Sequence, residues 1–239
     1  MKILRLISLL IDYPTAELIA EKDALLAVVA SSGLPAEHAE SLSAFIENRC
    51  RGDIVDWQEE YDGLFERGRS LSLLLFEHVH GESRDRGQAM VDLMNQYKEA
   101  GLEISTKELP DYIPLYLDFL STQGNDNARL GLQEVSHILA LLACRLEQRE
   151  SDYASLFHAL VGLSEVALDL NDLRGQIAGE VPDNTPKALD KVWEEEMVNF
   201  MDNAESSCSS NNRPAEGQRR DQYIPLNTEL LKTSSAGQV

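Results

Sequence analysis

Basic residues are scarce in this 239-residue sequence: 21 lysines and arginines stand against 41 aspartates and glutamates, giving a formal net charge of −20. Nucleic-acid binding depends on lysine and arginine to displace counterions from phosphates, so the sequence predicts no nucleic-acid partner. The same charge disfavours anionic lipid. An acidic surface attracts basic peptides and speeds their encounter, although it serves equally to keep a protein soluble.

Cysteine is also rare, and the three present, Cys50, Cys144 and Cys208, are far apart. None lies in a C-x-x-C pair, which excludes a disulfide framework and a zinc ribbon. Thiols that stay reduced in a cytosol fit this pattern. We therefore expect a cytoplasmic protein.

Long apolar runs are missing too. The first twelve residues briefly imitate a signal peptide, but Arg5 interrupts the run, Asp12 ends it and no small-residue cleavage site follows. The apolar positions of this segment predict a buried helix. No segment approaches the roughly 20 apolar residues that cross a bilayer, so we expect a soluble protein without direct membrane insertion.

Signatures of catalysis are absent from the sequence. It contains no nucleophile elbow, no phosphate-binding G-x-x-x-x-G-K loop and no dinucleotide fingerprint. The glycines Gly63, Gly68, Gly81 and Gly87 are too dispersed to predict a phosphate-binding loop. The sequence therefore predicts a protein that is not an enzyme.

The apolar residues that are present recur mainly at spacings of three and four, which indicates helices. We expect an all-α fold, a single compact multi-helix domain over residues 1–203. After about Asn203, serine, asparagine, glycine, glutamine and charged residues dominate. Such a segment buries too little apolar surface to offset its ordering entropy, so residues 204–239 are expected to form a disordered tail.

Caps, prolines and glycines set the expected element boundaries. Loops are expected at residues 67–70, 124–127 and 181–184. Leu71–Phe76 is nearly continuous apolar sequence, which is compatible with a strand, but leucine outnumbers β-branched residues and we expect a buried helix. The other expected helices run over 15–31, from Pro35, from Asp53 to about Phe65, 84–101, from Pro110, 128–149, 152–170 and from Thr185 onward.

The chemically densest stretch is residues 76–87, with two histidines, several carboxylates and two arginines. A zinc site or metal-dependent hydrolase built on His78, His80, Glu82 and Asp85 is one alternative. On a helix, however, H-x-H points its two rings about 200° apart, and no H-E-x-x-H signature is present. The other interpretation is a helix end whose Glu, His and Arg side chains form a hydrogen-bond and ion-pair network. We expect no metal.

Long stretches of the chain resemble a known family. The segments 61–69, 71–90 and 108–117 closely resemble the NarJ/TorD/DmsD-type redox-enzyme maturation chaperones, in the branch that assembles molybdenum-containing nitrate reductase. Asp12-Tyr13-Pro14 and Val192–Glu196 are similar as well. The resemblance covers the chain to about Phe200.

The resemblance implies a system-specific, all-helical chaperone that is absent from the finished enzyme. It implies that the chaperone binds the N-terminal segment of the nitrate reductase catalytic (alpha) subunit, holds it competent for molybdenum cofactor insertion and delays membrane docking. The implied partners are that subunit and proteins of molybdenum cofactor biosynthesis. No cofactor of its own is expected, and the chain is expected to be mostly monomeric. A generic helical adaptor is the further alternative.

The wider family carries an E-P-x-D-H type motif, to which Glu108, Pro110 and Asp111 look equivalent. Leu109 replaces the second motif residue and Tyr112 replaces the histidine, so this chain has no imidazole at that position. Apolar side chains would form a client groove and carboxylates its rim, and protonation of His78 or His80 is a hypothesis for tuning affinity. The candidate client-peptide-binding residues are Tyr61, Leu64, Phe65, Arg67, Leu75, Phe76, Glu77, His78, His80, Glu82, Arg84, Asp85, Glu108, Pro110, Asp111 and Tyr112.

Overall fold

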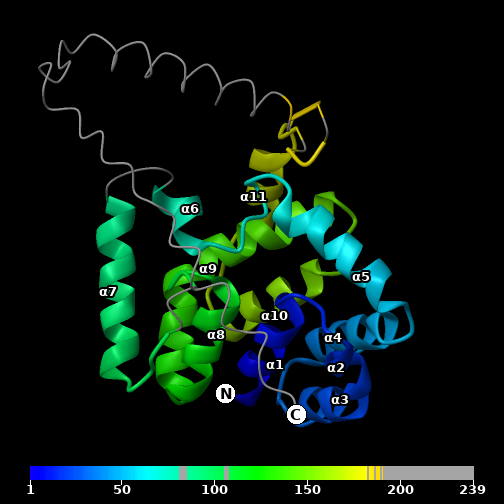
Figure 1. The fold of residues 1–239 in the computed structure, drawn as a ribbon, viewed down its shortest axis with the longest axis horizontal. Coiled ribbons are helices and arrows are strands. Elements are labelled where there is room, and N and C mark those ends of the chain that lie inside the picture. The colour runs from blue at the N-terminus through cyan, green and yellow to red at the C-terminus, as the bar shows by residue number, and fades with distance from the viewer. Residues whose placement is uncertain (81–84, 105–107, 182, 186, 189, 191–239) are drawn as a thin grey trace, which may run out of the picture. The chain divides into compact units, whose positions relative to one another are not determined.

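A computed structural model describes residues 1–80, 85–104, 108–181, 183–185, 187, 188 and 190, apart from the side chain of His80. The expected tail over 204–239 lies outside these residues, as does most of the helix expected after Thr185. The described helices (Figure 1) are α1 Lys2–Ile11, α2 Ala16–Ala20, α3 Lys22–Ala30, α4 Ala36–Arg49, α5 Ile54–Tyr61, the π-helix η1 Asp62–Glu66, α6 Leu75–His80, α7 Asp85–Glu99, α8 Ile113–Thr122, α9 Asn125–Gln148, α10 Ala154–Ser164 and α11 Leu170–Ile177.

Regular structure in the described part of the chain is helical, which confirms the all-α expectation. The helices belong to one unit, Met1–Val192. None of those described is both long and apolar enough to cross a membrane. The single β-type contact recorded there is an isolated antiparallel bridge between Leu74 and Tyr112.

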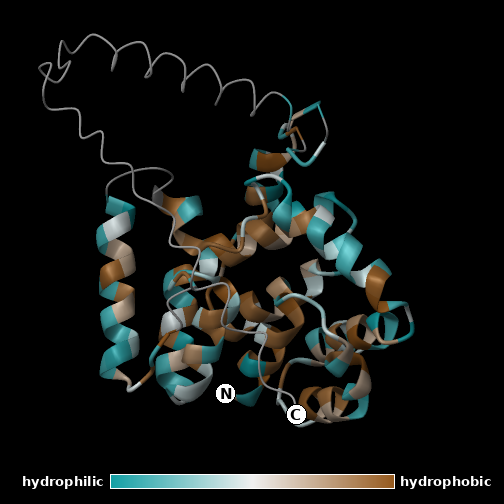
Figure 2. Cartoon of the chain, viewed as in Figure 1, coloured by the Kyte–Doolittle hydropathy of each residue, from teal (hydrophilic) through white to brown (hydrophobic). Residues whose placement is uncertain are grey.

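The core forms around α9, against which α10 and α11 pack, while α4 packs on α10 and α1 on α8. The spacings of three and four between Leu132, Val135, Leu139, Leu142 and Leu146 predict one apolar stripe on α9. In the structure Val135 is half-buried and the other four are buried. In Figure 2 the hydrophobic (brown) parts of the ribbon lie mostly toward the middle of the bundle and the hydrophilic (teal) parts mostly toward its outside. Burial of such side chains stabilises the fold by roughly 25 cal/mol per Å² of apolar area.

A second part of the core is aromatic. Its rings meet edge-on or at a tilt, at centroid distances of 5.0–6.4 Å, and belong to Phe45, Trp57, Tyr61, Phe65 and Tyr153. The indole Nε1 of Trp57 donates a hydrogen bond of 2.7 Å to the Tyr153 hydroxyl, so the polar ends of both rings are satisfied inside the core. This cluster fixes α4, α5 and η1 to the start of α10.

The N-terminal segment is the buried helix that its apolar pattern predicts. In α1, Leu4, Ile7, Leu10 and Ile11 have almost no exposed surface. The expected loop at 67–70 is also present, and Gly68 has φ +89° there. Asp53 caps α5 through a 2.7 Å hydrogen bond from the Val55 amide to its carboxylate.

The prediction of a helix over Leu71–Phe76 was wrong for its first four residues. The chain is non-helical from Leu71 to Leu74, and α6 begins only at Leu75. The segment instead exchanges backbone hydrogen bonds with residues 111–113: Ile113 N–H donates to Leu73 at 2.8 Å and Leu75 N–H donates to Asp111 at 2.9 Å. Tertiary pairing therefore outweighs the helix propensity of leucine.

The predicted helix over 152–170 is also divided, because α10 ends at Ser164. Glu165 has φ +57°, and the buried Ser164 hydroxyl donates to the Val161 carbonyl at 2.7 Å and accepts from the Val166 amide at 3.2 Å. These local side-chain bonds compete with the helix. The helix expected over 15–31 similarly breaks at Glu21 into α2 and α3.

Two other boundaries differ from expectation. The expected loop at 124–127 is reduced, because α9 already begins at Asn125 after Gly124 (φ +83°). The helix expected from Pro110 begins only at Ile113, because the backbone of residues 111–113 is paired with residues 73–75.

Candidate functional site

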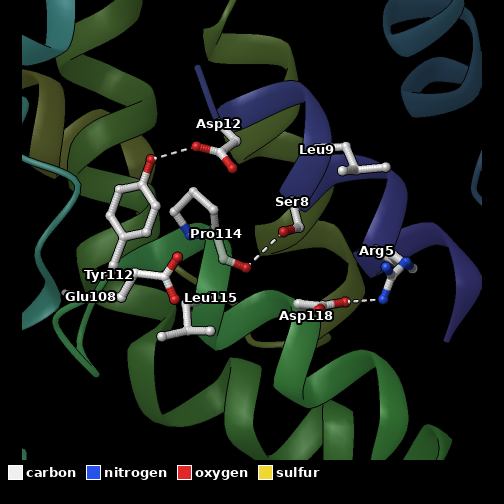
Figure 3. A pocket seen from close by; sticks show the side chains of 9 residues that line it. All are labelled: Arg5, Ser8, Leu9, Asp12, Glu108, Tyr112, Pro114, Leu115 and Asp118. Carbon is white, nitrogen blue, oxygen red and sulfur yellow. Dashed lines mark hydrogen bonds and ion pairs between the residues drawn. The ribbon is translucent and has the colours of Figure 1, made fainter. Parts of the chain in front are cut away.

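A surface pocket of about 250 Å³ lies where α1 meets α8 and the segment that precedes α8 (Figure 3). One wall is formed by side chains of α1 and of Asp12, the residue that follows it. The other wall is formed by Glu108 and Tyr112, which precede α8, and by the first turns of α8. The lining residues are Arg5, Ser8, Leu9, Asp12, Glu108, Tyr112, Pro114, Leu115 and Asp118.

Hydrogen bonds hold the two walls of this pocket together. Ser8 Oγ donates to the carbonyl of Pro114 at 2.6 Å, and the Arg5 guanidinium pairs with Asp118 at 2.6 Å. Pro114 lies in the first turn of α8, where its missing N–H costs no helical hydrogen bond. Leu4 and Ile7 on the opposite face of α1 anchor the helix in the core.

The pocket is acidic with an apolar lining. Three carboxylates, Asp12, Glu108 and Asp118, face one guanidinium, Arg5, which is already paired with Asp118. Leu9 is 41% exposed there. Tyr13 and Leu109, the chain neighbours of two lining residues, are also exposed apolar side chains. Carboxylates around exposed apolar groups suit an amphipathic segment that carries positive charge.

Asp111 lies in the same segment but has no exposed surface. Its Oδ2 accepts a 3.1 Å hydrogen bond from the Phe76 amide in the first turn of α6, so it satisfies one of the free N–H groups of that helix. Its Oδ1 is buried with no hydrogen-bond partner among the described residues. The guanidinium of Arg86 lies 4.0 Å from Oδ2.

Burial raises the pKa of Asp111, because removing a carboxylate from water disfavours its charged form. The hydrogen bond from Phe76 and the charge of Arg86 oppose this shift without cancelling it. Tyr97 from α7 holds the preceding turn through a 2.7 Å hydrogen bond from its hydroxyl to the Pro110 carbonyl. Asp111 thus helps to fix the backbone of the 108–112 segment, which carries the pocket residues Glu108 and Tyr112.

Tyr112 connects the pocket with the aromatic core. Its hydroxyl donates to Asp12 Oδ1 at 2.9 Å (Figure 3) and lies 3.4 Å from the Tyr61 hydroxyl. The ring of Tyr61 in turn packs edge-on against Tyr13 at 5.4 Å. A tyrosine at this position therefore joins α1 and the α5–η1 segment by hydrogen bonds through its hydroxyl.

Of the sequence-predicted residues that the structure describes, two line the pocket, Glu108 and Tyr112. Arg67 and Asp85 are exposed, and Phe76, Glu77 and His78 are half-buried. Glu82, Arg84 and the side chain of His80 lie outside the described residues. The remaining candidates are buried in this conformation: Tyr61, Leu64, Phe65, Leu75, Pro110 and Asp111.

The described part of the dense stretch 76–87 forms polar contacts of the kind expected for a helix end. Arg86 lies 3.4 Å from Glu77, and His78 Nε2 lies 2.8 Å from the Ser72 carbonyl. Burial lowers the pKa of His78, because removing the imidazolium from water disfavours its charged form. Among the described residues no group of three or more His, Cys, Asp or Glu side chains is arranged to hold a metal ion.

Sequence reasoning missed most of the α1 side of the pocket. The sequence of α1 does indicate a polar face. Arg5, Ser8 and Asp12 interrupt an otherwise apolar segment at spacings of three and four, so they lie on one side of the helix. That pattern does not reveal that α8, more than 100 residues later, supplies the other wall.

Comparison with known proteins gives a consistent result. Residues 32–159 match the family model described as nitrate reductase delta subunit. The chain is 45% identical over 227 residues to the "Nitrate reductase molybdenum cofactor assembly chaperone NarJ" of Escherichia coli K12, covering 93% of this chain and 96% of the relative. It is 45% identical to the "Probable nitrate reductase molybdenum cofactor assembly chaperone NarW" of the same strain, covering 88% of each chain. A third relative, from Bacillus subtilis strain 168, is 31% identical over 73% of this chain and 92% of its own length.

Proposed function

Because the chain belongs to the nitrate reductase delta subunit family, with molybdenum cofactor assembly chaperones among its relatives, we propose that it binds the N-terminal segment of the nitrate reductase catalytic subunit in the pocket between α1 and α8. Its role is that of an assembly chaperone and not of an enzyme. The single observation that carries the proposal is the acidic rim of this pocket around the exposed side chain of Leu9.

The size of the pocket favours a peptide client. About 250 Å³ is less than the roughly 300–1,000 Å³ of typical small-molecule sites. A pocket of this kind accepts a few side chains of a longer segment. The client would place apolar side chains against Leu9 and Leu115 and basic side chains against Glu108 and Asp12, as an amphipathic helix in a groove does.

Occupation of the pocket links peptide binding to client maturation. A segment held here is unavailable for docking to a membrane partner, and the client stays open for cofactor insertion while the complex lasts. In this proposal the chaperone acts in the cytoplasm, carries no resident cofactor, and works with the proteins that make the molybdenum cofactor.

Calorimetric titration of the full chain with the client's N-terminal peptide, at low and high salt, tests the proposal. We expect saturable one-to-one binding, a negative heat-capacity change from apolar burial and weaker affinity in high salt. Absence of binding in both conditions would refute recognition of this segment.

A variant pair locates the site. Glu108→Gln removes a charge from the pocket rim without changing the size of the side chain, and we expect about threefold to tenfold weaker peptide binding. Glu99→Gln makes the same change at an exposed position at the end of α7 and should leave affinity unchanged. Equal affinities for both variants would place the peptide elsewhere on the molecule.

A further inference from the structure

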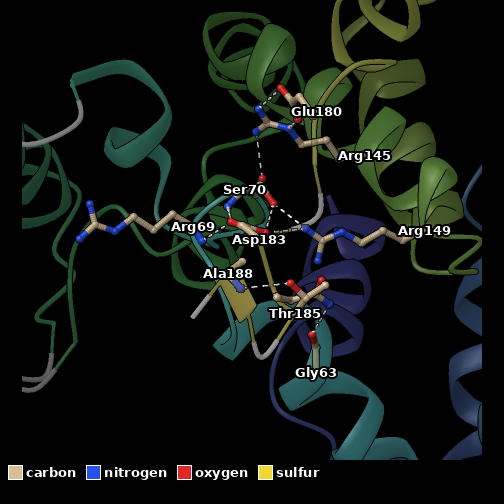
Figure 4. A network of polar contacts seen from close by, with 10 residues as sticks. Gly63, Arg69, Ser70, Arg145, Arg149, Glu180, Asp183, Thr185 and Ala188 are labelled. Carbon is tan, nitrogen blue, oxygen red and sulfur yellow. Dashed lines mark hydrogen bonds and ion pairs between the residues drawn. The ribbon is translucent and has the colours of Figure 1, made fainter. Parts of the chain in front are cut away.

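A compact group of hydrogen-bond donors surrounds the carboxylate of Asp183, far from the pocket in sequence (Figure 4). Asp183 Oδ2 accepts from the backbone amides of Arg69 and Ser70 at 2.6 and 2.7 Å. Its Oδ1 accepts from the Ser70 hydroxyl at 2.7 Å and from an Arg149 terminal nitrogen at 2.8 Å. Among the described residues, the two oxygens thus receive four hydrogen bonds, three of them from one loop and one from Arg149, the residue that follows α9.

Gly68 makes this close approach possible. Its φ of +89° is a conformation that side-chain-bearing residues rarely adopt, and a Cβ built on it would lie 2.6 Å from the Asp183 carboxyl carbon. Successive backbone amides beside a glycine of positive φ form the kind of concavity that binds anions in proteins. The loop is therefore shaped to hold an oxyanion against its backbone.

Two arginines lie at this site although the chain is strongly acidic, and each is paired with one carboxylate, Arg149 with Asp183 and Arg145 with Glu180. The side chain of Arg149 is only 13% exposed. Arg145, one helical turn earlier, donates to the Ser70 carbonyl at 2.9 Å and forms a bidentate pair with Glu180. Burial acts to raise the pKa of Asp183, but hydrogen bonds from Ser70, Arg149 and the Arg69 amide outweigh it and hold that pKa below its ordinary value.

One buried hydrogen-bond donor beside the Asp183 carboxylate is not used by that carboxylate. The second terminal nitrogen of Arg149, Nη1, is buried and has no hydrogen-bond partner among the described residues. A buried unpaired donor is costly. A carboxylate has only two oxygens, both already engaged, whereas a phosphate group offers further oxygens to the same guanidinium.

The segment that carries Asp183 is attached mainly through polar groups. Beyond the buried Ile177, residues 178–181 are all exposed, and Asp183 and Asn184 are half-buried. The recorded attachments of Asp183, Asn184 and Glu180 are hydrogen bonds and ion pairs, including one from Asn184 to the Gly63 carbonyl at 3.1 Å. A segment with little apolar burial opens at low free-energy cost.

We propose that the Gly68–Ser70 loop and Arg149 form a binding site for a phosphate group, and that Asp183 occupies this site as an internal substitute when no phosphate ligand is bound. The ligand is a phosphate monoester or inorganic phosphate, a transient ligand and not a resident cofactor. Its binding displaces Asp183 and releases the segment that begins after α11.

The test compares phosphate binding by the full chain and by Asp183→Ala, using calorimetry with inorganic phosphate, glycerol phosphate and acetate. Removing the internal competitor should strengthen phosphate binding at least tenfold, and acetate should bind at least tenfold more weakly than phosphate. Preference for glycerol phosphate over inorganic phosphate would identify an ester as the ligand, and the reverse would identify the free ion. Asp172→Ala, an exposed carboxylate on α11, is the matched control and should bind as the unaltered chain does.

A double variant links the effect to the site. Asp183→Ala combined with Arg149→Ala should lose at least tenfold in phosphate affinity relative to Asp183→Ala alone. The proposal is overturned if Asp183→Ala gains no affinity, if Arg149 makes no difference, or if acetate binds as tightly as phosphate.

The unaltered chain provides the decisive readout if Asp183→Ala fails to fold by circular dichroism. Phosphate should release the segment and accelerate tryptic cleavage after the exposed Lys187 at least threefold over sodium chloride of equal ionic strength. A reporter peptide corrects for any effect on trypsin itself. An unchanged cleavage rate would then overturn the proposal.

Discussion

Asp111 combines two roles that conflict energetically. Its carboxylate caps α6 through the Phe76 amide, which favours the charged form, yet it is fully buried with one oxygen unpaired among the described residues. Isolation of a charge from water is costly unless donors surround it. Burial of the Asp111 carboxylate therefore lowers the stability of the fold, while its hydrogen bond to Phe76 holds the backbone next to Glu108 and Tyr112 in place.

The pH dependence of this arrangement has a definite sign. Because burial raises the pKa of Asp111 above its ordinary value of 3.8, this side chain holds its proton to higher pH in the native chain than in the unfolded chain. The stability contribution of protonated Asp111 is therefore lost as pH rises through the raised pKa. Asp111→Asn removes this titration and should flatten that part of the stability profile.

Urea unfolding between pH 4 and 7 measures the effect, with the exposed Asp56→Asn as control. Asp111→Ala, which removes the cap as well, should cost about 0.5–2 kcal/mol at neutral pH. A profile for Asp111→Asn that is parallel to that of the unaltered chain would contradict the assignment.

Tyr112 places a phenol hydroxyl, and not an imidazole, beside the pocket. The resemblance implies a histidine at this position of the E-P-x-D-H type motif, whereas this chain has a phenol whose hydroxyl donates to Asp12 and lies 3.4 Å from the Tyr61 hydroxyl. Burial and the neighbouring Tyr61 and Asp12 raise the pKa of Tyr112, so it stays neutral through the physiological range. This position therefore contributes a hydrogen bond and not a titrating imidazole.

At the scale of the element, α1 has two functions on two faces. Ile7 has no exposed surface, whereas Leu9 on the same helix is 41% exposed at the pocket. The apolar pattern of the segment predicts the first face. The second face lines a pocket only because α8 lies beside it and forms the other wall.

Paired substitutions in α1 should separate stability from binding. Ile7→Ala leaves a cavity in the core and should cost about 2–5 kcal/mol of unfolding free energy. Leu9→Ala should change stability by less than about 1 kcal/mol but weaken client-peptide binding. Urea titration and calorimetry on both variants measure these effects, and a Leu9→Ala variant with unaltered peptide affinity would argue against a client seated at this face.

For the whole molecule, the net charge of −20 extends the effect of the pocket carboxylates to long range. Electrostatic attraction raises the association rate of a basic partner and is screened by salt. Raising sodium chloride from about 0.05 to 0.5 M should slow peptide association roughly tenfold while changing dissociation much less. Stopped-flow measurement tests this expectation, and a rate of association independent of salt would show that net charge has no part in recognition.

The sequence by itself determined the helical class, the buried α1, the core stripe of α9 and the loop at 67–70. These features depend on local periodicity, on caps such as Asp53 and on glycine at Gly68, all of which act over a few residues. The extent of the resemblance likewise predicted the family that the comparisons show.

Only the tertiary structure decided which segments meet. It paired Leu73 with Ile113, which replaced the expected start of a helix with an extended segment. It brought Asp118 to Arg5 and Arg149 to Ser70, 113 and 79 residues apart. No local pattern encodes such contacts, because their free energy arises when distant side chains are buried together and satisfy one another's hydrogen bonds.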